Sequence, residues 1–139
     1  MTKSIHNDNY YVNGAITGIG GVVKIGDDYY LIAASGKVLT NIEKHLGEEL
    51  TKGVIPVGPY KFGEDCKLER FTGIKNGYYY VDGIIGANAG LIQLDGDYYF
   101  ITKSGLVAKN QKRTITEETA NGFVNPGRYT FGEDGKMII

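Results

Sequence analysis

The chain carries one sequence twice. When it is shifted along itself by 69 residues it aligns without a gap, and 26 of the 70 overlapping positions are identical. Residues 28–30 (Asp-Tyr-Tyr) align with residues 97–99, and residues 62–65 (Phe-Gly-Glu-Asp) align with residues 131–134. A fixed period indicates a repeat architecture, in which each unit packs on its neighbour and presents its surface more than once. The repeat therefore argues against a single catalytic centre.

Charge and hydropathy exclude two classes of partner. The chain has 15 basic and 16 acidic residues and a net charge of −1, so it lacks the basic excess that a nucleic-acid backbone or an anionic membrane requires. No apolar run approaches the roughly 18 residues of a membrane span. We therefore expect neither a nucleic-acid partner nor membrane insertion.

Glycine turns between aromatic segments predict an all-β fold. Asn-Gly and Asp-Gly are strong hairpin signals, because a type I′ turn needs positive φ at both central residues. The chain has four such pairs, namely Asn13-Gly14, Asp82-Gly83, Asp95-Gly96 and Asp134-Gly135. Residues 21–25 and 90–94 are typical strands, and each turns back into a segment that begins with Tyr-Tyr. This pattern predicts about three β-hairpins in each 69-residue repeat.

One stretch leaves two structures open. Residues 41–50 have some helical spacing of apolar positions, whereas the aligned residues 112–119 are rich in β-branched threonine, which favours strand. Because the two copies should share a structure, we expect an extended arm or loop in both. In the second copy this arm should end at Asn121-Gly122.

Catalytic and metal chemistry have little support in the sequence. The repeated carboxylate pairs at 64–65 and 133–134 are adjacent in turns, where they diverge instead of converging on one bond. The four aspartates that a calcium ion might use, Asp27, Asp28, Asp95 and Asp97, have no EF-hand-like spacing and are better explained as turn residues. The single cysteine, Cys66, and the two histidines are not repeated. We expect no enzyme activity, no cofactor and no metal.

At residues 90–105 (GLIQLDGDYYFITKSG) the chain resembles the aromatic hairpin repeats of Gram-positive surface proteins. This cell-wall-binding superfamily includes choline-binding modules, glucan-binding repeats and the C-terminal oligopeptide repeats of large clostridial toxins. The closing motif at residues 125–136 is similar to that of longer surface proteins of gut Firmicutes. The resemblance implies a β-solenoid of stacked hairpins that binds carbohydrate or wall polymer. Trp is prominent in the choline cages of that superfamily and is absent here, so a neutral-sugar site on tyrosine rings is the open alternative.

The tyrosines are the candidate binding residues. Ten of the 11 stand where the other copy also has Tyr, so they belong either to the core or to a repeated site. In each adjacent pair the side chains point to opposite faces of a strand, which makes one of the two the better candidate for exposure. By analogy with the superfamily we predict ligand contacts from the second member of each pair, namely Tyr11, Tyr30, Tyr80 and Tyr99.

We therefore predict an all-β chain of two tandem repeats, residues 1–69 and 70–139, stacked as a short β-solenoid with one shared core. The expected function is non-catalytic binding of glycan or cell-wall polymer at a Gram-positive surface. The alternative is a structural spacer or protein-interaction stalk of a larger surface or phage protein. Residues 1–10 lack the apolar segment of a signal peptide. We thus expect a part of a longer extracellular or cell-surface protein, with self-association through exposed sheet edges.

Overall fold

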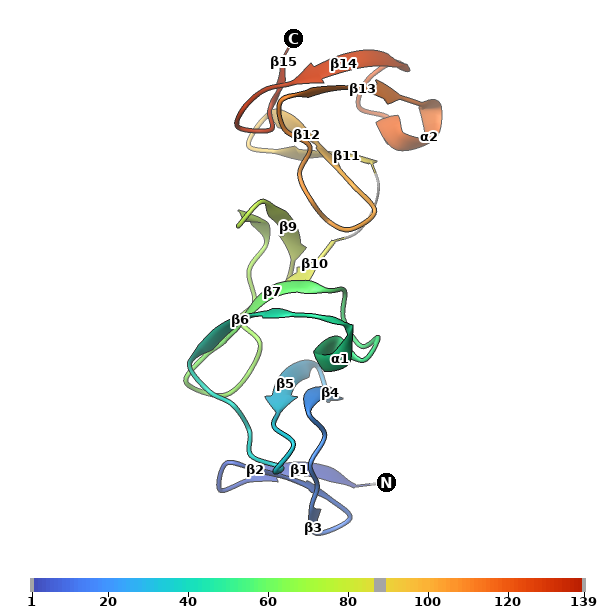
Figure 1. The fold of residues 1–139 in the computed structure, drawn as a ribbon. Helices are drawn as coiled ribbons and strands as arrows, with labels where there is room; N and C mark the ends of the chain where they lie inside the picture. The colour runs from blue at the N-terminus through green and yellow to red at the C-terminus, as the bar shows by residue number, and fades with distance from the viewer. Residues whose placement is uncertain (1, 87–89, 139) are drawn as a thin grey trace. The chain divides into compact units, whose positions relative to one another are not determined.

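A computed structural model describes residues 2–86 and 90–138. The chain divides into two compact units, Met1–Arg70 and Phe71–Ile139, and each is described by itself. Both units consist of small antiparallel sheets joined by short loops, with one turn of helix apiece (Figure 1). The predicted all-β fold class is therefore confirmed.

The first unit contains three sheets. The first sheet has the strand order β1-β2-β3, the second pairs β4 with β5, and the third pairs β6 with β7. A single helical turn, α1, lies between β6 and β7 in the sequence and contacts β4. The bounds are β1 Lys3–His6, β2 Asn9–Val12, β3 Ala15–Ile16, β4 Gly21–Ile25, β5 Asp28–Ile32, β6 Ile42–Leu46, α1 Glu48–Thr51 and β7 Gly58–Phe62.

The second unit has its elements in the same order and ends on an additional short strand. Its sheets have the orders β10-β9-β8, β11-β12 and β13-β14-β15, and the helical turn α2 contacts β11. The bounds are β8 Gly73–Lys75, β9 Tyr78–Val81, β10 Ile84–Ile85, β11 Gly90–Leu94, β12 Asp97–Ile101, β13 Gln111–Ile115, α2 Glu117–Ala120, β14 Gly127–Phe131 and β15 Met137–Ile138.

The predicted turns are two-residue hairpin loops at three of the four positions. At Asn13-Gly14, Asp82-Gly83 and Asp95-Gly96 both residues have positive φ, as type I′ geometry requires. The fourth expectation is wrong in detail, because at Asp134-Gly135 only the glycine has positive φ. There the Asp134 carboxylate accepts a hydrogen bond from the backbone N–H of Lys136 at 3.0 Å, which stabilises a longer loop between β14 and β15.

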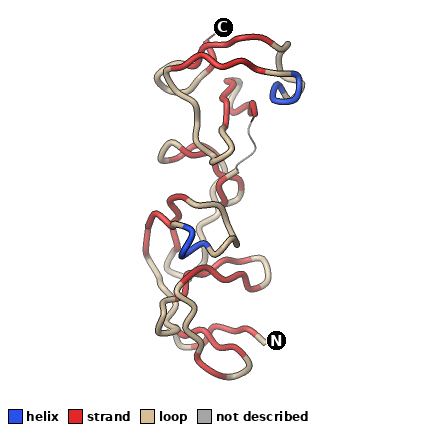
Figure 2. The backbone as a smooth tube through the Cα atoms, turned by 45° about the vertical axis from the view of Figure 1, so that its right-hand side comes forward, coloured by secondary structure: helices blue, strands red, loops and turns tan. Residues whose placement is uncertain are grey.

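The ambiguous stretch is part strand and part helix. The extended arm is present as β6 and β13, but in each unit a single helical turn follows it (Figure 2). The expectation of an extended arm or loop throughout is wrong at these turns, and the helical alternative holds at the end of residues 41–50. In the second unit the Thr116 hydroxyl accepts a hydrogen bond from the Thr119 N–H, and Thr119 bonds back to the Thr116 backbone. These local bonds close a capping box and outweigh the β-propensity of threonine.

Each unit has its own buried apolar cluster. In the first unit Tyr10, Val23, Ile32, Val38 and Cys66 pack together, with Tyr30 at the edge of the cluster. The cluster of the second unit is larger in aromatic content, and its members are Leu91, Phe100, Ala108, Ile115, Ala120, Phe131 and Met137. Residues from both arms of the Tyr-Tyr hairpins enter these clusters. At the ends of β5 and β12 both faces of the strand are buried, since the adjacent residues Leu31 and Ile32, and likewise Phe100 and Ile101, are all buried.

Candidate functional site

The four predicted tyrosines occupy three kinds of environment. Tyr30 on β5 and Tyr99 on β12 are half-buried at aligned positions of the two units. Tyr11 on β2 is also half-buried, and its ring lies 6.4 Å from that of His6. Tyr80 on β9 is only 5% exposed. The structure therefore brings Tyr30 and Tyr99, but not Tyr80, into equivalent accessible positions.

The expectation that Tyr80 is the exposed member of its pair is wrong. The Phe71 ring packs edge-on against Tyr80 with 6.2 Å between the ring centroids. The residue aligned with Phe71 in the first copy is Thr2, which offers no ring to cover Tyr11. The buried member of the tyrosine pair therefore differs between the units. It is the first tyrosine, Tyr10, in the first unit and the second tyrosine, Tyr80, in the second unit. A ligand contact from Tyr11 or Tyr80 stays a prediction.

In the first unit Asp28, two residues before Tyr30 on β5, lines a polar groove of about 470 Å³. Two elements form it, the start of β5 and the turn that follows β7. The backbone N–H of Leu68 donates to the Tyr29 carbonyl at 2.9 Å and fixes that turn against β5. The groove is lined by Asp28, Gly63, Asp65, Lys67, Leu68, Glu69 and Arg70.

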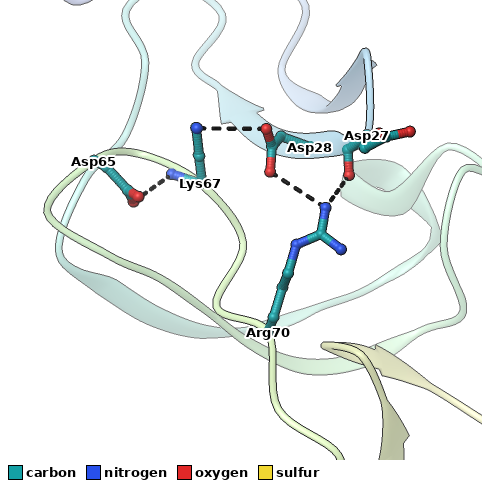
Figure 3. Close-up of polar contacts among 5 residues, drawn as sticks. All are labelled: Asp27, Asp28, Asp65, Lys67 and Arg70. Carbon is teal, nitrogen blue, oxygen red and sulfur yellow. Dashed lines mark hydrogen bonds and ion pairs between the residues drawn. The ribbon is translucent and has the colours of Figure 1, made fainter.

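Two cations converge on one carboxylate in this groove. Lys67 Nζ lies 3.5 Å from Asp28 Oδ2, and Arg70 Nη2 lies 3.4 Å from Asp28 Oδ1 (Figure 3). Arg70 also donates to the Asp27 carbonyl, and the Lys67 N–H donates to Asp65 Oδ1 at 3.1 Å. These contacts hold the polar side chains in place at the surface. Exposed ion pairs of this kind add little stability.

Charged residues that line this groove affect the pKa of the Tyr30 hydroxyl. Burial raises the pKa of Tyr30, and the nearby Asp28 carboxylate raises it further, while Lys67 opposes the shift. The ring packs on the apolar cluster, whereas the hydroxyl is close to the charged rim. Tyr30 thus presents an apolar ring and a protonated hydroxyl that can donate a hydrogen bond.

The second unit builds the same constellation from aligned residues. Lys136 Nζ lies 3.5 Å from Asp97 Oδ2, and the Lys136 N–H donates to Asp134 Oδ1. The Asp97 carboxylate raises the pKa of Lys136 most, and Tyr99 and Asp134 raise it further. We name this constellation the Asp–Tyr–Lys site. Its members are Asp28, Tyr30, Asp65 and Lys67 in the first unit, and Asp97, Tyr99, Asp134 and Lys136 in the second.

Sequence reasoning had found the tyrosines of this site but not its lysines. Lys67 and Lys136 are among the identical positions of the two copies, and this identity is a signal that could have singled them out. The aspartates were interpreted as turn residues, and the hydrogen bonds of Asp65 and Asp134 agree with that role. Within residues 2–86 and 90–138 no cluster of His, Cys, Asp or Glu is suited to hold a metal ion.

Other tyrosines have structural roles. The Tyr60 hydroxyl donates to the Pro56 carbonyl at 2.8 Å, and the Tyr129 hydroxyl donates to the Asn125 carbonyl at 2.6 Å. These aligned bonds close the loop after each helical turn. Because each hydroxyl is already used as a donor, Tyr60 and Tyr129 are poorer ligand candidates than Tyr30 and Tyr99.

No family model and no curated protein matches the sequence. Among solved structures, the chain is similar to the modular autolysin LytC from Streptococcus pneumoniae in complex with a synthetic peptidoglycan ligand. The TM-score is 0.52 at 14% identity, over 85% of this chain and 23% of that one. Choline-binding protein F and the choline-binding domain of CbpL, both from Streptococcus pneumoniae, also match, with TM-scores of 0.42 and 0.44 at 20% and 13% identity. The match to choline-binding protein F covers 99% of this chain and 40% of that one. The match to the CbpL domain covers 98% of this chain and 76% of that one.

The likeness to LytC shows a shared fold, and the predicted resemblance to wall-binding hairpin repeats is confirmed at that level. The chain spans about a quarter of the LytC chain and two fifths of choline-binding protein F. None of the described helices is long and apolar enough to cross a membrane.

Proposed function

We propose that the protein is a non-catalytic repeat module that binds carbohydrate or cell-wall polymer at the surface of a Gram-positive bacterium. Two repeats, residues 1–69 and 70–139, would stack as a short β-solenoid of a longer extracellular protein, with one shared core. The observation that carries the proposal is the recurrence of the Asp–Tyr–Lys site, with Tyr30 and Tyr99 half-buried at aligned positions. A structural spacer has no need of accessible tyrosine rings at equivalent points of both copies.

The chemistry of the site suits a polyhydroxylated ligand. A tyrosine ring offers flat apolar surface, while the carboxylates and the ammonium group offer acceptors and donors for sugar hydroxyls. A quaternary ammonium group is less suitable, because Lys67 and Arg70 already neutralise Asp28 in the first unit. Cation–π attraction is also weaker on tyrosine than on tryptophan, which the chain lacks.

Two weak sites on one chain would reinforce each other on a polymer. Once one site is occupied, the other meets the same polymer at an effective concentration in the millimolar range, and avidity exceeds either single affinity. The repeat therefore has a functional consequence that one copy would lack. A catalytic centre gains nothing comparable from duplication.

A pull-down on insoluble glycans and Gram-positive cell walls tests this function. The purified chain is compared with the double variant Tyr30→Ala/Tyr99→Ala and with Tyr30→Leu/Tyr99→Leu, which keeps apolar bulk on the core but removes the rings. We expect retention of the unchanged chain by at least one polymer and loss in both variants, with their circular dichroism unchanged. Absence of retention on every polymer would instead favour the spacer or protein-interaction stalk.

Self-association through sheet edges is part of the proposal. Strands β3 and β15 lie at the edges of their sheets and carry Ile16 and Ile138, which are 53% and 60% exposed. An edge strand with an exposed apolar side chain is a template for pairing with another chain. We expect a molecular mass by light scattering that rises with concentration, and a monodisperse monomer at high concentration would contradict this.

A further inference from the structure

Two aromatic rings of the second unit form a platform outside the Asp–Tyr–Lys site. The rings of Tyr98 and Phe123 have centroids 5.5 Å apart and are tilted by 52°. Tyr98 is half-buried on β12, and Phe123 is 40% exposed in the loop after α2. The two rings contact each other and together present a wider apolar surface than one partly exposed ring would.

The platform has free polar handles beside it. Gln93 lies directly opposite Tyr98 in the β11–β12 ladder and is exposed. Among the residues that the structure describes, neither the Gln93 amide nor the Tyr98 hydroxyl makes a hydrogen bond. Side chains directly opposite in a ladder have Cβ atoms about 5 Å apart, so the amide and the ring can contact one ligand. None of the three side chains is charged.

The backbone holds Phe123 in this position. Asn121, at the C-terminal end of α2, donates from Nδ2 to the Leu91 carbonyl of β11 at 2.9 Å. The Phe123 N–H donates to the Ala120 carbonyl at 2.9 Å, which closes the turn that leads into the loop. Because β11 pairs with β12, these bonds connect the loop of Phe123 to the strand that carries Tyr98.

The first unit lacks this platform. The residue aligned with Phe123 is Val54, and the residue aligned with Gln93 is Lys24. Lys24 Nζ lies 5.7 Å from the centroid of the Tyr29 ring, which is the counterpart of Tyr98. In the first unit a lysine cation therefore lies over the tyrosine ring, whereas in the second unit the neutral Gln93 lies opposite the corresponding tyrosine.

We propose that Tyr98, Phe123 and Gln93 form a subsite for a neutral hexopyranose ring, present in the second unit only. The apolar face of the sugar would lie on the rings, and the amide and phenol would bond its hydroxyls. This inference rests on the proposed glycan-binding function and adds a substrate class and an asymmetry between the copies. It predicts that the second repeat binds neutral glycan more strongly than the first.

The test is a titration of the whole chain, followed by NMR of aromatic C–H groups, with three neutral probes: cellohexaose, laminarihexaose and isomaltohexaose. We expect at least one probe to shift the Tyr98 and Phe123 signals. Phe123→Val should then weaken its binding about three- to tenfold, the loss expected for one aromatic contact. Valine at this position is compatible with the fold, because the first unit carries it.

Matched exchanges complete the design. Gln93→Lys gives the second unit the first unit's residue and should weaken binding, whereas Val54→Phe with Lys24→Gln should create a new set of shifts in the first unit. The inference is overturned if no neutral probe shifts these rings, if Phe123→Val binds unchanged, or if choline chloride alone produces the shifts. Wall retention that survives Phe123→Val but not Tyr30→Leu/Tyr99→Leu would overturn the subsite and leave the proposed function standing. Probe-induced shifts at Phe123 without retention on any Gram-positive wall would leave the subsite standing and overturn the wall-binding part of the proposed function.

Discussion

Replacing the same turn glycine in the two copies should have unequal costs. Gly36 and Gly105 occupy aligned Ser-Gly turns with φ values of +92° and +88°. A methyl group at Gly105 would overlap Ile85 Cγ2, and one at Gly36 would approach Ile16 Cγ2 to 2.6 Å. The two isoleucines differ in freedom to move, because Ile85 is 2% exposed and Ile16 is 53% exposed.

The magnitudes follow from these contacts. Either alanine pays about 1–2 kcal/mol for positive φ. At Gly105 the buried Ile85 must also shift, which adds about 1–3 kcal/mol of overpacking, whereas Ile16 can swing into solvent. We therefore expect Gly105→Ala to reduce the free energy of unfolding by about 1–3 kcal/mol more than Gly36→Ala.

Urea unfolding followed by tyrosine fluorescence and circular dichroism measures this difference, with comparison at an unchanged m value. Gly96→Ala is the control for backbone cost alone, since Gly96 has φ +86° and no heavy atom within 4 Å of the added carbon. Equal losses for the variants at positions 36 and 105 would refute the reasoning, as would a larger loss at position 36.

Three further predictions concern caps and charges. Thr116→Ala should lower the free energy of unfolding by about 1 kcal/mol, because it removes the side-chain cap of α2. Gly47→Thr should raise the free energy of unfolding by a few tenths of about 1 kcal/mol, because the start of α1 has no side-chain cap. Thermal unfolding of both variants measures these changes. Burial raises the pKa of Tyr10 above its ordinary value of 10.0, so the folded state holds this proton more tightly. The resulting stability is complete below pH 10.0 and lost as the pH rises through the higher folded pKa, and Tyr10→Phe should flatten this alkaline decline in urea titrations. Asp97→Asn should lower the pKa of Lys136 towards its ordinary value in an NMR titration, and an unchanged pKa would contradict the ion pair.

The hairpins were predictable because their signals are local. An Asn-Gly or Asp-Gly pair determines its own backbone geometry, so Asn13-Gly14 and Asp95-Gly96 could be assigned from the sequence. The one-turn helices were not predicted, since four residues are too few to show a period, and α2 depends on side-chain bonds between Thr116 and Thr119.

The binding residues were predicted only in part, because exposure depends on distant residues. The burial of Tyr80 requires Phe71, which has no counterpart in the first copy, so the repeat itself misled the interpretation. The ion pair of Lys67 with Asp28 joins the turn after β7 to the start of β5 and cannot be inferred from spacing. The burial of Tyr80 thus follows from a difference between the copies, and the ion pair follows from a tertiary contact that both copies share.

The most direct test of the account is the retention of single and double tyrosine variants on one wall polymer. If both Asp–Tyr–Lys sites bind, Tyr30→Leu and Tyr99→Leu should each weaken retention, and their combination should reduce it far more than either alone, because avidity is lost with the second site. Folding of each variant is verified by circular dichroism. Retention of the folded double variant equal to that of the unchanged chain would contradict the central claim that these tyrosines hold the ligand.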